Sequence, residues 1–332
     1  MKYAIKINNL TKGFHDKTNF MPKWLVSDSH KNKFYAVKDV SFDVKKREIF
    51  GVLGPNGCGK STLIRMISTL LTPDKGSVEV FNIDALKKPG EIKKLINRVS
   101  VEASFFKRLS AKENLLYASR LYGIEDKVAI KKFQQILKDL NFPESMVNSQ
   151  MMKFSRGMQQ KVSIARGFIT DPILILLDEP TTGLDPKSKL DVQNFILNLH
   201  AKKNLTIVIS SHDMLEVEKL CDRIAIMDKG KIIAMGTSDE LKEMVMKENT
   251  YELETSDSAK SKRSLQKFKQ VHNIITHNGT VRFCTKDITL VADKITTTLK
   301  EKNIKFKNLK QVVPSLEDVF LEITGKSLED RP

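Results

Sequence analysis

Long apolar runs are missing from this sequence, and cysteine is scarce. No run approaches the ~20 residues that a membrane-spanning helix needs. The first residues, 1–7, alternate like a strand and lack the apolar core of a secretory signal peptide. The three cysteines, Cys58, Cys221 and Cys284, have neither disulfide nor metal-site spacing. We therefore exclude a membrane-spanning chain and expect a soluble protein made in the reducing cytosol.

Acidic residues are fewer than basic ones. The chain has 40 Asp and Glu but 56 Lys and Arg, which gives a net charge of +16. Such a balance suits an ordinary lysine-rich surface, the anionic inner face of a membrane, or nucleic acid. The basic residues are spread along the chain, with only short runs such as 260–263. This spread favours the ordinary surface first, the membrane second and nucleic acid last.

The segment Gly54–Ser61 reads Gly-Pro-Asn-Gly-Cys-Gly-Lys-Ser and fits the phosphate-binding pattern G-x-x-x-x-G-K-[ST]. Its glycines let the backbone aim successive N–H groups at phosphate oxygens. Lys60 adds a mobile positive charge, and the Ser61 hydroxyl can bind magnesium. A strand pattern at 48–53 precedes the loop and a helix pattern at 62–71 follows it, as the motif requires. The predicted nucleotide-contacting residues are Gly54, Pro55, Asn56, Gly57, Cys58, Gly59, Lys60, Ser61 and Thr62.

Strand and helix patterns alternate after this loop, which predicts an α/β domain with a largely parallel core sheet. The continuous apolar runs at 173–177 and 205–210 are typical of buried parallel strands. Residues 109–168 are rich in helical patterns and predict an inserted helical subdomain. Residues 13–33 have no clear period and read as a loop insertion between two strands.

The composition shifts near residue 245, and the remainder parses as strand, helix, two strands, helix and strand. That βαββαβ order predicts a small α+β domain of the ferredoxin-like type. Ser315 and Asp318 form a capping box for a last short helix. We predict one domain over 1–240 and an accessory domain over 246–326.

Two neighbouring carboxylates end the buried run at 173–177. An acidic residue at the tip of such a strand is how phosphate-loop proteins hold magnesium, so Asp178 is the predicted metal-side carboxylate. Glu179 follows it and can polarise a water for attack on the γ-phosphate, as a general base. Together with the loop, these carboxylates predict hydrolysis of a nucleoside triphosphate.

A third motif, Phe154-Ser155-Arg156-Gly157-Met158, makes the resemblance specific. The chain resembles the nucleotide-binding subunit of an ATP-binding cassette (ABC) transporter, whose signature loop is usually Leu-Ser-Gly-Gly-Gln. Ser155 and Gly157 keep the positions that would face phosphate, whereas Arg156 and Met158 depart from the commonest form. The resemblance implies a dimer with two ATP molecules held between the subunits.

Other family motifs follow in order. Gly183-Leu184-Asp185 resembles the loop that links the two sites across the dimer, and Asp185 is a predicted site residue. Ser210-Ser211-His212-Asp213 resembles the switch-histidine motif, which implies that His212 contacts the γ-phosphate and helps to order Glu179. The predicted catalytic residues are therefore Lys60, Glu179 and His212.

Two family features are imperfect. The glutamine that normally links the magnesium site to the permease should lie near Val101, but no glutamine is there, and Glu102 is the nearest polar candidate. An aromatic residue that stacks on adenine usually precedes the phosphate-binding loop. Phe14 and Tyr35 both compete for that role, because the insertion between them obscures the register.

The resemblance implies an ATPase that uses ATP and Mg²⁺ to drive a separate integral-membrane permease from the cytoplasmic face of the membrane. Its partners would be a second copy or a paralogous ATPase subunit, the permease near residues 102–109, and the anionic membrane surface. The signature variant and the C-terminal domain favour export, and no nucleic acid is expected. The alternative is a cassette ATPase acting on nucleic acid or ribosomes, which the basic charge would suit. Against it, the chain has one cassette and no long coiled coil.

Overall fold

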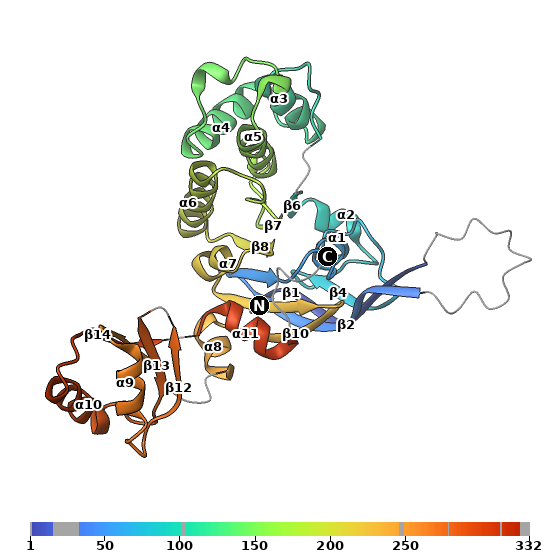
Figure 1. Cartoon of the computed structure of the whole chain (residues 1–332). Helices are drawn as coiled ribbons and strands as arrows, with labels where there is room; N and C mark the ends of the chain where they lie inside the picture. Colours follow the sequence, from blue (N-terminus) through green and yellow to red (C-terminus); the bar gives the residue numbers. More distant parts are fainter. Residues whose placement is uncertain are drawn as a thin grey trace, which may run out of the picture. The chain divides into compact units, whose positions relative to one another are not determined.

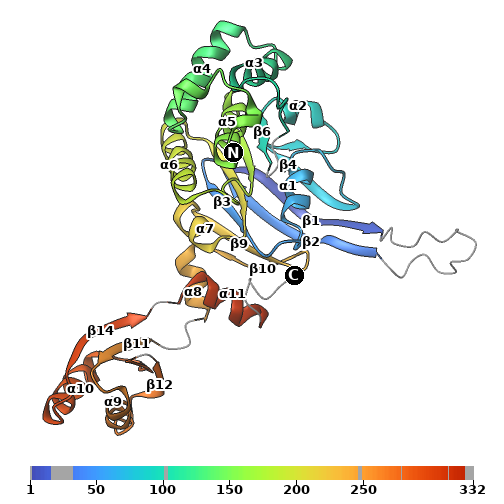
Figure 2. The same ribbon diagram turned by 45° about the horizontal axis from the view of Figure 1, so that its top comes forward.

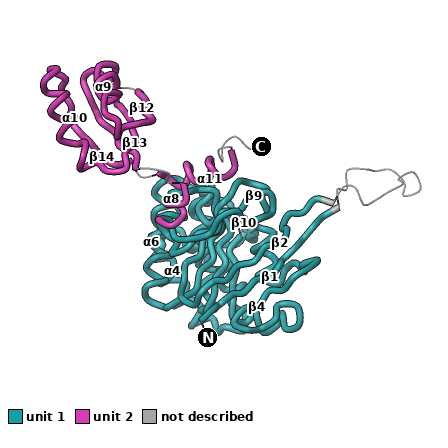
Figure 3. The backbone as a smooth tube through the Cα atoms, turned by 90° about the horizontal axis from the view of Figure 1, so that it is seen from below, with its two compact units in different colours: residues 1–238, 326–332 teal, residues 239–325 magenta. Residues whose placement is uncertain are grey.

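The computed structural model describes residues 2–15, 33–100, 104–245, 249–277, 279–312 and 314–325. The backbone divides into two compact units, one of residues 1–238 with 326–332 and the other of residues 239–325 (Figure 3). Most of the insertion expected over 13–33, and Glu102, lie outside the described residues. Within the described part, no helix is long and apolar enough to cross a membrane.

A six-stranded sheet forms the centre of the first unit, in the order β10-β9-β3-β8-β7-β6. Its strands are β3 (Ile49–Leu53), β6 (Ile96–Val99), β7 (Leu174–Asp178), β8 (Thr206–Ser211), β9 (Arg223–Asp228) and β10 (Lys231–Gly236). All neighbours pair in parallel except β9 and β10, which form the expected hairpin. The prediction of a largely parallel core sheet is confirmed.

The strands of this sheet bury side chains on both faces, which explains their continuous apolar runs. Phe50, Val52 and Val208 point into one hydrophobic cluster, while Ile207 and Ile209 point into another. The first cluster also contains side chains of α1 (Lys60–Ile67). Helix α1 ends earlier than residue 71 because Thr69 adopts a left-handed φ of 60°.

A second, antiparallel sheet shares the first cluster, in the order β2-β1-β4-β5. Its strands are β1 (Tyr3–His15), β2 (Lys33–Lys45), β4 (Lys75–Val80) and β5 (Ile83–Asp84). The long β1–β2 hairpin has several register shifts and pairs Phe14 with Phe34. The hairpin therefore brings residues from both sides of the insertion together.

The remaining helices of the first unit are α2 (Pro89–Lys93), α3 (Ala111–Leu121), α4 (Asp126–Asp139), α5 (Arg156–Phe168), α6 (Pro186–Lys203) and α7 (Met214–Leu220), with short 3-10 turns at Glu144–Met146 and Met151–Lys153 (Figures 1 and 2). Helix α2 adds Ile92 to the first cluster, whereas the others add buried side chains to the second. Figure 1 shows α3, α4 and α5 gathered as one group, the expected helical subdomain. Ser110 starts it with a capping box to Glu113.

The second unit contains the predicted βαββαβ order. Its elements are α8 (Ser238–Val245), β11 (Thr250–Thr255), α9 (Ser258–Leu265), β12 (His272–His277), β13 (Thr280–Cys284), α10 (Thr289–Glu301), β14 (Phe306–Val312) and α11 (Leu316–Thr324). The sheet order β12-β13-β11-β14 is wholly antiparallel. Phe283, Ile295 and Leu265 belong to its own buried core. The predicted capping box of Ser315 and Asp318 is present at α11.

Candidate functional site

The phosphate-binding loop joins the end of β3 to the start of α1, as its flanks predict. Gly59 precedes the helix with a φ of 112°, a conformation that side chains rarely adopt. A Cβ there would also lie 1.9 Å from the carbonyl oxygen of Ala36. The loop can therefore curl tightly against β2 only because this position is glycine. Its N–H groups lie at the positive end of α1, where an anion is favoured.

Lys60 lies under this loop and is only 4% exposed. Its Nζ donates to the carbonyl oxygens of Gly54, at 2.8 Å, and Pro55, at 3.0 Å. The same Nζ lies 3.3 Å from Oε1 of Glu179. A buried ammonium needs such partners, since an unpaired one would be expensive. The structure thus brings the predicted phosphate-binding cation and the predicted general base into contact.

Glu179 follows β7 in a left-handed conformation, with a φ of 50°. Its N–H donates to the carbonyl oxygen of Ser210, at 3.0 Å, and lies 3.2 Å from the Ser210 hydroxyl. The Thr182 hydroxyl donates to its Oε2, at 3.0 Å. These contacts turn the carboxylate toward the loop rather than into solvent, and its side chain is 11% exposed.

Asp178 is the last residue of β7 and is 1% exposed. Its Oδ1 accepts hydrogen bonds from the hydroxyls of Ser61, at 3.0 Å, and Ser210, at 2.7 Å. Its Oδ2 accepts from Nη2 of Arg98, at 3.0 Å. The two predicted magnesium-side residues, Ser61 and Asp178, therefore touch. Arg98 was missed from the sequence, because nothing local connects it to a carboxylate on another strand.

His212 lies just past β8, and its Nδ1 is 3.3 Å from Oε2 of Glu179. That ring nitrogen makes no aligned hydrogen bond within the part of the chain that the structure describes. The ring is 39% exposed. The predicted switch histidine therefore sits beside the predicted base, with its buried Nδ1 next to that carboxylate.

A buried carboxyl group, Glu216, follows this histidine four residues later and was not predicted. It accepts hydrogen bonds from the hydroxyls of Thr181 and Ser211, each at 2.6 Å. Burial raises its pKa, and the two hydroxyl bonds oppose that rise. Glu216 therefore ties the turn after Glu179 to the segment that carries His212.

A cavity of about 330 Å³ opens beside the loop. Its lining residues are Phe14, Phe34, Ala36, Asn56, Gly57, Gly59, Lys60, Ser61, Thr62 and Glu179. Phe14 is 42% exposed there, and its cross-strand partner Phe34 is 59% exposed. Tyr35 does not line this cavity, because alternate residues of a strand face opposite sides. Phe34 was overlooked, because only the pairing of β1 with β2 brings it next to Phe14.

Cys58 lies inside the loop and is buried. Burial raises the pKa of its thiol, an effect that the nearby Lys60 opposes. The thiol fills space under the loop, and its interpretation as a small residue at a variable position stays a prediction.

The signature and linking loops meet each other, away from this cavity. Ser155 caps α5 by accepting from the N–H of Met158, at 3.3 Å. Asp185 caps α6 by accepting from the N–H of Ser188, at 2.9 Å. Hydrogen bonding from the Ser188 hydroxyl, and then from its N–H, lowers the pKa of Asp185. A Cβ on Gly157 would lie 2.5 Å from the Ser188 hydroxyl oxygen. The glycine therefore lets α5 approach α6 closely, and neither Ser155 nor Gly157 lines the loop cavity.

Comparison with known proteins is consistent with these motifs. A family model described as ABC transporter matches residues 37–182, and one described as the C-terminal domain of DrrA1-3-like ATP-binding proteins matches residues 236–324. The chain is 33% identical over 300 residues to the linearmycin resistance ATP-binding protein LnrL of Bacillus subtilis, covering 89% of this chain and 95% of LnrL. The chain belongs to the ATP-binding subunits of ABC transporters.

Two further comparisons agree with this assignment. The chain is 42% identical over 209 residues to the ABC transporter ATP-binding protein NatA of Bacillus subtilis, covering 63% of this chain and 84% of NatA. A solved dimeric ATP-binding cassette in a post-hydrolysis state, bound to ADP and phosphate, matches with a TM-score of 0.61 and 26% identity. That match covers 70% of this chain and 98% of the cassette. The predictions of the cassette fold and of a transporter ATPase that uses ATP are confirmed, over the nucleic-acid or ribosome alternative.

The cassette also has donors that fit magnesium. Ser61 and Asp178 offer a hydroxyl and a carboxylate, the hard oxygen donors that this ion prefers. Among the described residues, no group of three or more His, Cys, Asp or Glu side chains could hold a metal by itself. Magnesium typically uses one or two carboxylates and completes its shell with phosphates and water. Glu102 lies outside the described residues, so its replacement of the usual glutamine stays a prediction.

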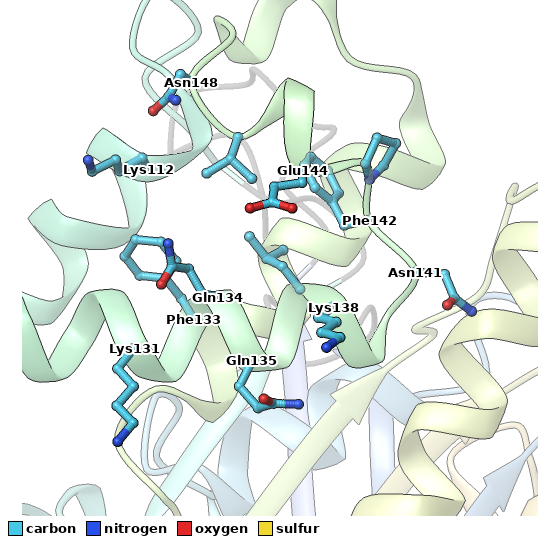
Figure 4. A pocket seen from close by; sticks show the side chains of 13 residues that line it. Lys112, Lys131, Phe133, Gln134, Gln135, Lys138, Asn141, Phe142, Glu144 and Asn148 are labelled. Carbon is cyan, nitrogen blue, oxygen red and sulfur yellow. The ribbon is translucent and has the colours of Figure 1, made fainter.

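A larger cavity, of about 850 Å³, lies on the helical subdomain of the cassette (Figure 4). Its walls come from α3, α4 and residues 141–148, and Lys112, Lys131, Lys138 and Glu144 are among them. None of the predicted site residues lines it. The larger cavity is therefore not the predicted site.

Proposed function

We propose that this chain is the energy-converting subunit of an exporter, and that it binds ATP in the loop cavity and closes onto a second ATPase subunit. The contact of Lys60 with Glu179 carries this proposal, because it places a phosphate-binding cation beside a carboxylate that can activate water. Export is supported by the relative LnrL, whose name refers to linearmycin resistance, and by the DrrA-like C-terminal domain. The variant Glu179→Gln tests the proposal, because it removes the base and keeps the shape of the site.

Hydrolysis would use three side chains in separate roles. Lys60 would leave its loop carbonyls and bind the outer phosphates, where its charge stabilises the transition state. Glu179 would accept a proton from the attacking water. His212 would hold Glu179 and the γ-phosphate in register from its exposed edge. Magnesium, when bound at Ser61 and Asp178, would neutralise charge on the β- and γ-phosphates.

A second subunit would complete the site. The signature residues Ser155 and Gly157 do not line the loop cavity of their own chain, which leaves them available to the ATP of a partner. Either a second copy of this chain or a paralogous subunit would suffice. Because Gly157 packs on Ser188 and Asp185 caps the same helix, the signature and linking loops would meet the partner together.

We expect Phe14, rather than Tyr35, to stack on adenine, because of these two residues Phe14 lines the loop cavity and Tyr35 does not. The Phe14→Ala variant should bind ATP roughly tenfold more weakly, in keeping with the ~1–3 kcal/mol that base stacking contributes. Tyr35→Ala, the matched control on the neighbouring strand, should bind ATP normally. Calorimetric titration with ATP and with inorganic triphosphate checks this. Because the triphosphate has no base to stack, the Phe14→Ala variant should bind it as tightly as the wild type does. A larger loss in Tyr35→Ala would reverse the assignment.

The proposed partner in the membrane is a permease encoded as a separate chain, contacted near residues 102–109. The family of ATP-binding transporter subunits supports this partner. The net charge of +16 would add attraction to the anionic cytoplasmic surface, which is where we place the protein. Nucleic acid is not a proposed partner, because the basic residues are spread along the sequence.

Without a permease, the purified chain should bind weakly to vesicles rich in anionic lipid. It should not bind to vesicles of neutral lipid. Raising the ionic strength to ~1 M should release it, because the Debye length then falls to about 3 Å. Flotation of the full-length chain measures this binding. Tight binding to duplex DNA at physiological salt, with no vesicle adhesion, would instead favour a cassette that acts on nucleic acid.

A further inference from the structure

Arg98 makes a contact that the proposed roles do not use. It lies on β6, the edge strand of the central sheet, where its backbone is in register with Leu176. Its long side chain reaches forward along β7 and places Nη2 3.0 Å from Oδ2 of Asp178. The Arg98 side chain is 18% exposed and the Asp178 side chain only 2%. This is therefore a largely buried ion pair at the carboxylate that is proposed to face magnesium.

The hydrogen bonds of Asp178 already occupy most of the acceptor positions of its carboxylate. Each carboxylate oxygen has about two acceptor positions. On Oδ1, the hydroxyls of Ser61 and Ser210 use both. On Oδ2, Arg98 uses one and leaves one. The charge of this carboxylate is thus already balanced by a cation that belongs to the protein.

The guanidinium itself has spare donor capacity. Its buried Nε has no hydrogen-bond partner within the described part of the chain. Arg98 is therefore held at Asp178 by the ion pair through Nη2 rather than by a closed network, and its remaining N–H groups can serve another acceptor. The same segment departs from the family pattern a few residues later, because the glutamine expected near Val101 is absent.

We propose that Arg98 is a positioning residue that sets how strongly nucleotide binding depends on magnesium. This inference rests on the proposed function, since it assumes that the loop cavity binds ATP. Without a cation, the Asp178 carboxylate repels the terminal phosphates of ATP. Arg98 offsets that repulsion, so the chain retains much of its affinity for ATP without magnesium. The same positive charge repels magnesium when the ion arrives, so the ion contributes less affinity than at a bare carboxylate.

The measurable quantity is a ratio of dissociation constants for a non-hydrolysable ATP analogue. It is the dissociation constant in EDTA divided by the dissociation constant in saturating magnesium. By linkage, this ratio reports the coupling between magnesium and nucleotide. Arg98→Gln keeps a hydrogen-bond donor near Asp178 but removes the charge. We expect its ratio to be roughly tenfold larger than that of the wild type, because a unit charge a few ångströms from the ion is only partly screened.

Three further variants separate charge from shape. Arg98→Lys keeps the charge and should keep a ratio near that of the wild type. Arg65→Gln makes the same charge change at an exposed position of α1 and should also leave the ratio unchanged. Arg98→Met is neutral and apolar, suits a buried strand, and should behave like Arg98→Gln, which covers the case in which the glutamine variant does not fold. Titration calorimetry on the full-length chain gives all the ratios, and thermal unfolding checks each fold.

A folded neutral variant with the wild-type ratio would overturn the role of Arg98 while leaving ATP binding intact. Equal increases in Arg98→Gln and Arg98→Lys would also overturn it, because geometry rather than charge would then control the ratio. If the folded wild-type chain bound no nucleotide under either condition, the proposed function itself would fail, so the two failures are distinguishable.

Discussion

Glu179→Gln should bind ATP with near-normal affinity, stop turning it over and accumulate as an ATP-bound dimer. The amide keeps the size of the side chain and can still accept from Thr182, so the turn after β7 should persist. It cannot take a proton from water, and loss of a general base typically costs about 10²- to 10⁴-fold in rate. Phosphate release at steady state and sedimentation velocity with ATP measure the two effects.

The control for this variant is Glu125→Gln, an exposed glutamate that begins α4 without a side-chain cap. It makes the same chemical change and should hydrolyse ATP at the wild-type rate as a transient dimer. ADP should not trap Glu179→Gln as a dimer, because the γ-phosphate is missing. Unchanged turnover in Glu179→Gln would remove this residue from the role of base and transfer it to another group near His212.

Local patterns predicted the parts of this protein that depend on neighbours in sequence. The phosphate-binding loop could be recognised because a strand, glycines and a helix follow one another directly. The βαββαβ order of the second unit followed from short alternating segments and the turn near Gly279. In each case the side chains that define the element lie within a few residues of one another.

The contacts that the sequence did not reveal join distant segments. Arg98 reaches Asp178 from the neighbouring strand, 80 residues away in the sequence, and no periodicity encodes that contact. Phe34 reaches the cavity only because the β1–β2 hairpin pairs it with Phe14 across the insertion. Glu216 is 1% exposed and accepts hydrogen bonds from two hydroxyls, one of which lies 35 residues away in the sequence. Packing, rather than local preference, decides these positions.

Lys60→Ala should abolish nucleotide binding, with the affinity for ATP reduced by roughly 100-fold or more. The alanine has no charge to offer the outer phosphates, and each charge-assisted hydrogen bond it forfeits is worth ~1.5–3 kcal/mol. The loop glycines should still present their N–H groups, so the loss reflects the missing cation. Calorimetric titration with ATP and magnesium measures it, and exposed Lys127→Ala is the matched control. Normal ATP affinity in Lys60→Ala would contradict the role assigned to this lysine.

Lys60→Ala should also destabilise the nucleotide-free chain, because it removes the ammonium that lies 3.3 Å from the Glu179 carboxylate. A largely buried carboxylate that loses its cation is costly even with the Thr182 hydroxyl still donating to it, whereas an amide is less so. Adding Glu179→Gln to Lys60→Ala should therefore recover part of the lost thermal stability without recovering ATP binding. Recovery of both would mean that the single variant lost ATP only because its fold was damaged. Recovery of stability alone separates the two roles of Lys60, one as the partner of a buried carboxylate and the other as the cation that receives phosphate.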